Sequence, residues 1–422
     1  MPTSKPSHAA VDMLRLLRAG GIEVDRLAGL PTVADFRARA RRKLPRMAFD
    51  FIDGGAGSEV TRRANLLDLA EVRLVPRTMV DVSEVNLATT LNGQPLPMPV
   101  VLAPCGLIRI AGGEGELAAV RAAGKVGAPY TISTAASWSI EEIAEHATGP
   151  LWFQLYLWRS RDVVRTLVDR ARAVGCAALV VTTDVVVNGK RPRDHRNGMS
   201  IPPRITARNA LSTALHPRWF LSLLRGPAIG FRNLQGIAEG SSAMSHQDYV
   251  NTELANLSPS WEDLAWLRRQ WSGPLYVKGV LSTEDAAAAL AAGADGVWVS
   301  NHGGRQLDSA LSSVRVLPGI LDAVNGRVPV LLDGGIRSGT DVVKVLAMGA
   351  NAVAIGRSWV WGVAAAGERG VARVLEIYRQ EITETLQLMG RPSVGDLASR
   401  LVSYPAAWTG SGSGEDRDRV DG

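Results

Sequence analysis

A histidine within a glycine-rich run is the strongest candidate for acid–base chemistry in this chain. His302 lies in SNHGGRQLD (300–308), directly after an apolar run typical of a buried strand. An imidazole titrates near neutrality, so it can accept a proton without a large pKa shift. Arg305 can bind a carboxylate through two parallel hydrogen bonds. We therefore favour a proton-abstracting base over the alternative, a histidine that only completes a turn.

Two further groups stand at the ends of apolar runs and complement this histidine. Asp184 can orient the imidazole and stabilise its charged form. Lys278 ends an apolar strand, so its ammonium group must point into an internal site or lose its charge. It is either a permanent charge beside a cofactor that becomes anionic, or a Schiff-base lysine as in barrel aldolases. Its position does not separate these roles.

Glycine and arginine recur together in two segments, DGGIRSG (333–339) and IGRS (355–358). Small residues allow backbone N–H groups to approach an anion, and Arg337 or Arg357 supplies positive charge. The alternative is that these glycines only form tight turns. Because both segments pair glycine with arginine, we favour a phosphate site.

Eight short apolar runs supply the elements that must position these groups. They are MPVVLA (98–103), PYTIS (129–133), LWFQL (151–155), AALVVTT (177–183), PLYVKG (274–279), DGVWVS (295–300), VPVLLD (328–333) and NAVAIG (351–356). Most are followed by a helical pattern, and all but one of the intervals between their starts are 21 to 33 residues. This is the rhythm of repeated βα units and predicts an α/β fold, a closed (β/α)₈ barrel. The long interval marks an insertion at 184–260.

In this frame the chemistry-bearing residues fall at or just after the carboxyl ends of strands, where barrel enzymes build their sites. Besides the residues above, they are Ala103, Pro104, Cys105, Gly106, Ser133, Gln154, Tyr156, Thr182, Ser300, Asp333, Gly335 and Gly356.

The flanks of the barrel divide the rest of the chain. We expect an N-terminal extension (1–30), a helical lead-in (31–97), a barrel over 98–390, and a C-terminal helix with a disordered tail (391–422). Thr32 and Asp35 resemble a capping box, Pro45 can begin a helix, and Gly54 with Gly55 would stop it. Residues 366–389 have the pattern of an amphipathic helix.

Composition excludes several classes of protein. The 422 residues are 46% hydrophobic and 21% charged, which is typical of a globular chain. The two cysteines, Cys105 and Cys176, form no disulfide framework or metal-type spacing, so we expect no metal and a reducing, cytoplasmic setting. We identify no secretory signal or membrane span. The net charge of +6 is concentrated in 37–46 and 190–235, but no nucleic-acid module accompanies it.

At this point the motifs carry a family resemblance. RRKLPRMAFDFIDGGAGSE, APCGL, WFQLY, TTDVVVNGKRPRD, YVKG, SNHGGRQLD, DGGIRSG and IGR occur in the order expected for FMN-dependent 2-hydroxy acid oxidases and dehydrogenases. The chain resembles this family over about 31–390, most closely its (S)-mandelate dehydrogenase and flavin-type L-lactate dehydrogenase branches. The resemblance implies FMN, oxidation of an (S)-2-hydroxy acid to the 2-oxo acid, and a homo-oligomer, a tetramer in many relatives.

The resemblance also implies roles for matching residues. His302 would remove the α-proton of the substrate or assist hydride transfer, and Asp184 would orient it. Arg305 and Arg191 would bind the carboxylate, and Tyr156 would hydrogen-bond the substrate. Lys278 would stabilise the reduced flavin. The flavin would be lined by Ala103, Pro104, Cys105, Gly106, Ser133, Gln154, Thr182 and Ser300. Its ribityl chain and phosphate would be held by Asp333, Gly335, Arg337, Gly356 and Arg357.

Two positions depart from the family pattern. Phe51 stands where the family has a substrate-binding tyrosine, so a hydrogen bond to the charged substrate is lost, which costs about 1.5–3 kcal/mol. Ala135 replaces the bulky residue of oxidases that act on small acids. We interpret this as room for an aromatic or longer side chain, as in mandelate, although L-lactate remains a candidate.

The segment 207–225 combines aromatic and aliphatic residues with arginines and is too short to span a bilayer. It suits a position in the membrane interface, or else a loop that covers the active site or an oligomer contact. The resemblance favours peripheral attachment to the inner face of the cell membrane, with electrons passed to a quinone or other respiratory acceptor. The alternatives are a soluble peroxide-forming oxidase and, in another class, a Schiff-base aldolase or flavin-dependent isomerase.

Overall fold

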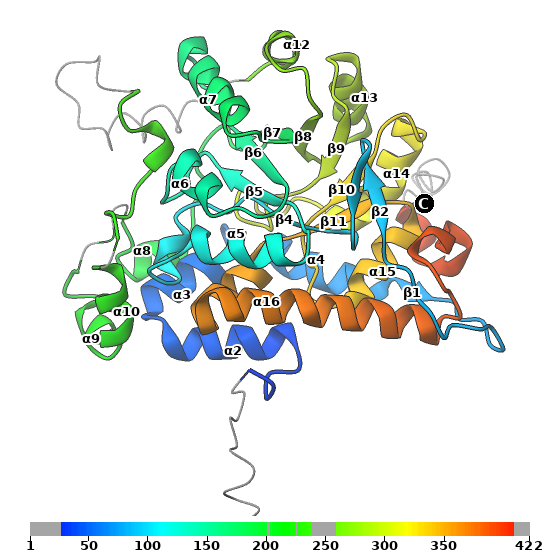
Figure 1. Ribbon diagram of the computed structural model, residues 1–422, viewed down its shortest axis with the longest axis horizontal. Coiled ribbons are helices and arrows are strands. Elements are labelled where there is room, and N and C mark those ends of the chain that lie inside the picture. Colours follow the sequence, from blue (N-terminus) through cyan, green and yellow to red (C-terminus); the bar gives the residue numbers. More distant parts are fainter. Residues whose placement is uncertain (1–26, 201–202, 204, 225, 238–258, 409–422) are drawn as a thin grey trace, which may run out of the picture.

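The computed structural model describes residues 27–200, 203, 205–224, 226–237 and 259–408 (Figure 1). Eight parallel strands close into a barrel in the order β10-β11-β4-β5-β6-β7-β8-β9. They are β4 (Val100–Leu102), β5 (Tyr130–Ser133), β6 (Leu151–Leu155), β7 (Ala178–Thr182), β8 (Leu275–Val280), β9 (Gly296–Val299), β10 (Val330–Leu332) and β11 (Ala352–Ile355). The register Val353 to Val100 joins the last strand to the first. The expected (β/α)₈ barrel is confirmed.

Helices surround the barrel, and most begin at a cap residue that the sequence offers. They are α5 (Glu116–Lys125), α6 (Ile140–Glu145), α7 (Arg161–Ala173), α12 (Trp261–Gln270), α13 (Thr283–Ala291), α14 (Ser313–Val324), α15 (Gly339–Met348) and α16 (Arg357–Leu388). Ser139, Ser260 and Ser338 each form a complete capping box, which satisfies N–H groups that the first helical turn leaves free.

Helix α16 is longer than the sequence pattern predicts. It begins at Arg357, directly after β11, and bends at Ala366 and Gly367, where Gly367 has a φ of 60°. The expected helix over 366–389 is therefore the second arm of a kinked helix. Only glycine adopts such a left-handed conformation readily, which explains why the bend is here.

The lead-in is helical only in its first half. Helices α2 (Val33–Lys43), α3 (Arg46–Asp53) and α4 (Val60–Glu71) are followed by strands β1 (Arg73–Leu74), β2 (Thr89–Leu91) and β3 (Gln94–Leu96). The expectation of helix throughout 31–97 is wrong after Glu71. The capping box at Thr32 and Asp35 is present, as expected, and α3 runs from its N-cap Pro45 to its C-cap Gly54.

The β2–β3 hairpin closes the amino end of the barrel. Leu91 and Leu96 are buried in one cluster with the inward-facing Trp152 and Trp298. The amide of Asn92 donates to the Tyr276 hydroxyl at 2.9 Å, and the Trp152 indole donates to Gln94 at 3.0 Å. Bulky aromatic side chains and the hairpin thus fill this end, and the opposite end is left for a site.

The chain after α16 contains no further α-helix among the described residues. Residues 391–408 form η3 (Val394–Asp396), η4 (Ser399–Leu401), η5 (Ala406–Trp408) and strand β12 (Val402–Ser403). Strand β12 pairs antiparallel with β1. The C-terminal helix expected within 391–422 is therefore wrong for this part, and the tail expected to be disordered, 410–422, lies outside the described residues.

The insertion carries short helices near the mouth of the barrel: α8 (Pro192–Arg196), α9 (Ala210–Ala214), α10 (Pro217–Leu223) and η2 (Arg232–Leu234). Figure 1 shows α9 and α10 at the same end of the molecule as α3 and α8. The backbone N–H of Arg46 at the start of α3 donates to Ser212 of α9 at 2.9 Å. Within the described part of the chain, no helix is both long and apolar enough to cross a membrane.

Candidate active site

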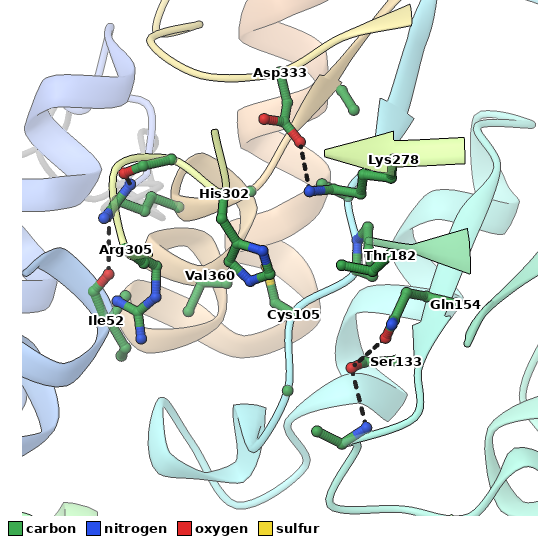
Figure 2. A pocket seen from close by; sticks show the side chains of 18 of the residues that line it. Ile52, Cys105, Ser133, Gln154, Thr182, Lys278, His302, Arg305, Asp333 and Val360 are labelled. Atoms are coloured by element: carbon green, nitrogen blue, oxygen red, sulfur yellow. Dashed lines mark hydrogen bonds and ion pairs between the residues drawn. The ribbon is translucent and has the colours of Figure 1, made fainter. Parts of the chain in front are cut away.

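A cavity of about 230 Å³ lies at the carboxyl ends of the barrel strands (Figure 2). Its walls include almost every site residue predicted from the sequence. These are Phe51, Ala103, Pro104, Cys105, Gly106, Ser133, Ala135, Gln154, Tyr156, Thr182, Arg191, Lys278, His302, Arg305, Asp333, Gly335, Arg337, Gly356 and Arg357. The remaining two, Asp184 and Ser300, lie directly behind this wall and hydrogen-bond to residues in it.

A strained turn carries His302 into the cavity. Its φ is 57°, in the left-handed region, and Gly303 and Gly304 also have positive φ. The backbone N–H of His302 donates to the Ser300 hydroxyl at 3.0 Å, which helps to fix this conformation. Left-handed backbone is rare outside glycine, so its occurrence at a reactive side chain supports a functional constraint.

Asp184 holds the imidazole from behind. Its Oδ1 lies 3.0 Å from Nδ1 of His302. Burial alone would raise the pKa of Asp184, but His302 and Lys278 outweigh it and hold this pKa below its ordinary value. A carboxylate at Nδ1 favours the tautomer protonated there and leaves Nε2 free to accept a proton. This geometry is suited to a base and a group that orients it.

Lys278 is a buried cation held by a network on neighbouring strands. Its Nζ donates to the Ser300 hydroxyl at 2.8 Å and lies 3.3 Å from Oδ2 of Asp333. Ser300 in turn donates to Asp333 at 2.7 Å, and the Trp298 indole donates to the same carboxylate at 3.0 Å. Burial would lower the pKa of Lys278, but Asp333 and Asp184 raise it above its usual range. The ammonium therefore stays charged at neutral pH.

Two arginines face the ring of Phe51 from the rim of the cavity. The guanidinium carbons of Arg305 and Arg191 lie 5.3 Å and 5.5 Å from the ring centre. Arg305 also donates to the backbone carbonyl of Phe51 at 2.7 Å. Burial, and then the neighbouring Arg191, lower the pKa of Arg305 to about 10, so the Arg305 guanidinium remains charged at neutral pH. Charge of this kind, together with the nearby Tyr156 hydroxyl, suits a carboxylate ligand.

The loops after β10 and β11 form a second cationic region. Burial, followed by Arg305 and Arg337, lowers the pKa of Arg357 well below its usual range. Burial also lowers the pKa of Arg337. Buried cations that disfavour one another's charge are relieved by an anion. A side chain at Gly335 would meet the backbone oxygen of Asn65 at 2.1 Å, so close packing requires this glycine in addition to any anion contact.

Unpaired polar atoms deeper in the cavity test whether a flavin fits. Gln154 accepts hydrogen bonds from the Ser133 hydroxyl at 3.1 Å and the Thr134 N–H at 3.2 Å, but its buried Nε2 has no partner among the described residues. The buried Thr182 hydroxyl is also without one. Each unmet group costs about 1–3 kcal/mol. A flat ring with donors and acceptors, joined to a phosphate, would satisfy these groups and the arginines, so FMN fits.

The apolar wall beside these groups includes Cys105. Burial raises the pKa of its thiol to about 12, so it stays protonated and unreactive at neutral pH.

The sequence did not identify several apolar residues of the cavity, namely Leu107, Ile108, Val185 and Phe231. Leu107 and Ile108 directly follow the APCG run, which was a usable signal. Phe231 belongs to the insertion, and its role in the wall agrees with the idea that this segment covers the site. Asn233 holds the chain around Phe231 against the barrel, because the Asn233 amide donates to the Ser133 carbonyl at 3.0 Å.

Comparison with known proteins agrees with this geometry. The family profile described as FMN-dependent dehydrogenase matches residues 40–404. The chain is 44% identical over 368 residues to L-lactate dehydrogenase of Pectobacterium atrosepticum, covering 86% of this chain and 95% of the relative. Its identity to L-lactate dehydrogenase of Pseudomonas aeruginosa strain LESB58 is also 44%, covering 86% and 96%.

Solved structures give the same result. A crystal structure of the monotopic membrane protein (S)-mandelate dehydrogenase superposes with a TM-score of 0.84 at 40% identity, covering 89% of this chain and 99% of that one. A mandelate oxidase structure superposes with a TM-score of 0.76 at 38% identity, covering 89% and 98%. The barrel, the flavin-compatible cavity and these relatives agree, and the chain belongs to the FMN-dependent dehydrogenase family.

Proposed function

We propose that this enzyme oxidises an (S)-2-hydroxy acid to the corresponding 2-oxo acid. The observation that carries the proposal is the His302–Asp184 pair facing one cavity with Arg305, Arg191 and the buried cation Lys278. The reaction removes two electrons and two protons from the CH–OH group of the substrate and leaves its carboxylate intact. The names of the relatives, L-lactate dehydrogenase and (S)-mandelate dehydrogenase, support this class of substrate.

The chain supplies proton transfer and orientation. Nε2 of His302 takes one proton of the CH–OH group, and Asp184 stabilises the imidazolium that results. Arg305 and Arg191 hold the carboxylate, which fixes the CH–OH group against the base. The Tyr156 hydroxyl remains protonated at neutral pH, because burial and then Asp184 raise its pKa, and it donates a hydrogen bond to the substrate.

When bound, FMN would supply the acceptor for the electron pair and for the second proton of the CH–OH group. Arg337, Arg357, Asp333 and Gly335 would hold its phosphate and ribityl chain. Ser133, Gln154, Thr182 and the wall 103–106 would contact its ring, with Lys278 beside it as a fixed positive charge. A charge that is already in place needs no reorganisation when negative charge develops nearby.

The substrate side of the cavity favours an aromatic or larger acid. Leu107, Ile108, Val185 and Phe231 provide an apolar wall, and Ala135 leaves space that a bulky residue would fill. An apolar side chain gains about 25 cal/mol for each Å² that it buries. We therefore place a mandelate-like acid first and L-lactate second.

An exposed apolar face on the insertion supports a membrane-associated dehydrogenase. Leu211, Leu215 and Leu224 are 75%, 70% and 66% exposed. Arg208 precedes them in the chain, and Arg218 lies between Leu215 and Leu224. Apolar residues bordered by cations suit the interface of an anionic membrane. We propose peripheral attachment at the inner face of the cell membrane, a quinone as electron acceptor, and a homotetramer. Light scattering of the purified enzyme measures its oligomeric state and so tests the homotetramer.

Anaerobic titration of the purified, yellow enzyme tests the reaction. (S)-Mandelate, L-lactate and glycolate are added in turn, and flavin bleaching is followed by absorbance. We expect bleaching by the first two, fastest with (S)-mandelate, and a failure of all acids would overturn the proposal. Oxygen uptake measured against reduction of a soluble quinone analogue then separates a dehydrogenase from a peroxide-forming oxidase.

A further inference from the structure

Helix α8 places Arg191 at the rim of the cavity, and one side chain of the helix connects it to α3. Nη2 of Arg193 lies 2.6 Å from Oε2 of Glu59, and Nη1 lies 3.3 Å from both Oδ1 of Asp50 and Oδ2 of Asp53. A single guanidinium thus bridges three carboxylates. The planar fork of arginine suits such an arrangement, whereas a lysine ammonium does not.

Two of the three carboxylates, those of Asp53 and Glu59, are fixed without Arg193. The Asp53 side chain is fully buried and accepts two hydrogen bonds from Arg37, at 2.6 Å and 2.8 Å. Glu59 accepts from the Gly55 N–H at 2.9 Å and pairs with Arg62 at 2.8 Å. Helix α3 is also held at its carboxyl end, where Arg357 donates to the Gly54 carbonyl at 2.7 Å. Helix α3 is therefore a rigid support.

Helix α8 is seated on that support through side chains, in addition to the backbone hydrogen bond from the Gly57 N–H to the carbonyl of Lys190, which precedes the helix, at 2.9 Å. Its own ion pair, from Arg191 to Asp194 at 2.7 Å, is internal. Among the described residues, the side-chain hydrogen bonds and ion pairs from α8 and its C-cap to α3 are those of Arg193 and of Asn197, whose amide donates to Asp50 at 2.6 Å. The guanidinium of Arg191 faces Phe51, which α3 carries. The alignment of Arg191 with Phe51 thus follows from the seating of α8 on α3.

We infer that Arg193 is a positioning residue that sets the carboxylate-binding geometry by holding Arg191 opposite Phe51. The inference rests on the proposed function for the identity of the ligand group. Arg193 does not line the cavity, so it acts through Arg191.

The test compares Arg193→Met with Arg196→Met, which removes the same charge from an exposed position on the same helix. Arg193→Lys keeps the positive charge but removes the planar, forked guanidinium group. For each holoenzyme we measure steady-state kinetics with (S)-mandelate, FMN content and thermal melting. Binding of phenylacetate and of uncharged phenylacetamide is measured by the shift of flavin absorbance. Arg191→Met and the Arg191→Met/Arg193→Met double variant complete a thermodynamic cycle.

We expect Arg193→Met to raise KM about tenfold with kcat nearly unchanged, and to weaken phenylacetate binding by a similar factor. Arg193→Met should not change the binding of phenylacetamide, and Arg196→Met should keep the original KM and phenylacetate affinity. Arg193→Lys should have values of both quantities between those of the original enzyme and of Arg193→Met. The double variant should have the same KM and phenylacetate affinity as Arg191→Met. The inference would be overturned if the fold-changes in KM or phenylacetate affinity of the two single variants multiplied in the double variant. A loss of kcat with normal KM in Arg193→Met would also overturn it. If Arg193→Met does not fold, Arg193→Lys decides by the same readouts. The phenylacetate measurement does not require turnover, so failure of the proposed reaction and failure of this inference are distinguishable.

Discussion

Nδ1 of His302 lies 3.0 Å from Oδ1 of Asp184, although 118 residues separate them in the chain. The barrel produces this contact, because the loops after β7 and β9 both leave its carboxyl end. The aspartate fixes the direction of the ring, so that Nε2 points to the cavity in which a substrate must bind. Several expectations depend on this pair.

Replacing Asp184 with asparagine should slow flavin reduction by about two to three orders of magnitude, because the imidazolium loses its negative partner and the imidazole its preferred tautomer. Stopped-flow absorbance with a saturating 2-hydroxy acid measures this rate. FMN content should be unchanged. A variant that reduces flavin at the original rate would show that Asp184 does not assist the base.

The same pair predicts a pH dependence of stability. The folded-state pKa of Asp184 lies below its ordinary value of 3.8, so the ionised carboxylate stabilises the fold above that pH and the contribution is lost as pH falls through the folded pKa. The difference in melting temperature between the original enzyme and Asp184→Asn should therefore be constant from pH 5 to 7, a range that begins about one unit above the ordinary pKa. The difference should shrink at lower pH. Scanning fluorimetry across this range provides the measurement. A difference that does not change with pH contradicts the expected shift.

Phe51→Tyr should restore a hydroxyl beside Arg305 and Arg191. One added hydrogen bond to a carboxylate corresponds to about 1.5 kcal/mol, or roughly a tenfold lower KM, with little change in kcat. Phe51→Leu is the matched control, because it removes the ring that both guanidiniums face and should raise KM. Equal KM values for the tyrosine and phenylalanine forms would mean that the substrate carboxylate lies out of reach of this position.

Lys278 should not form an imine. Its raised pKa keeps the amine protonated, and a protonated amine is not a nucleophile. Borohydride added with a 2-oxo acid should leave the intact mass of the FMN-free protein unchanged. Lys278→Met should reduce flavin at least about a hundredfold more slowly, because a pre-organised charge is lost. A borohydride-dependent mass increase at Lys278 would instead favour the aldolase alternative.

Membrane attachment can be tested without removing the insertion. Trp219 of α10 is buried and its indole donates to the Ile110 carbonyl at 2.8 Å, so deletion of this segment would also damage the barrel loop. Substituting serine for Leu211, Leu215 and Leu224 should release the enzyme from anionic vesicles while dye reduction continues. Serine at the exposed Leu388, on the far arm of α16, is the control. Persistent sedimentation with vesicles would refute interfacial binding through this face.

Much of the site was predictable, because a parallel barrel converts sequence order into spatial convergence. Once the eight strands were recognised, residues such as Gln154 and Lys278 had to meet at one end, since each lies near the carboxyl end of a buried strand. The capping box at Thr32 was predictable for a similar reason, because it depends on residues only three apart.

Contacts that depend on tertiary packing were not predictable. The β2–β3 hairpin was mistaken for part of a helical region, because strands of three residues leave too short a pattern to detect. Phe231 gave no periodic signal, and its place in the cavity wall is fixed by the hydrogen bonds of Asn233 to a distant loop. The segment 207–225 was expected to suit the membrane interface, yet its Trp219 is buried and its indole donates to the Ile110 carbonyl.

The hairpin that closes the amino end of the barrel also limits the routes by which ligands can reach the cavity. Aromatic side chains and the hairpin fill one end. We therefore expect the hydroxy acid, its oxo product and the oxidant of the reduced flavin to approach through the opposite end, where the cavity lies. Ligands that enter through the same opening cannot occupy it at the same time. In a barrel that opens at one end only, oxidation of the hydroxy acid and reoxidation of the flavin should therefore follow one another in time.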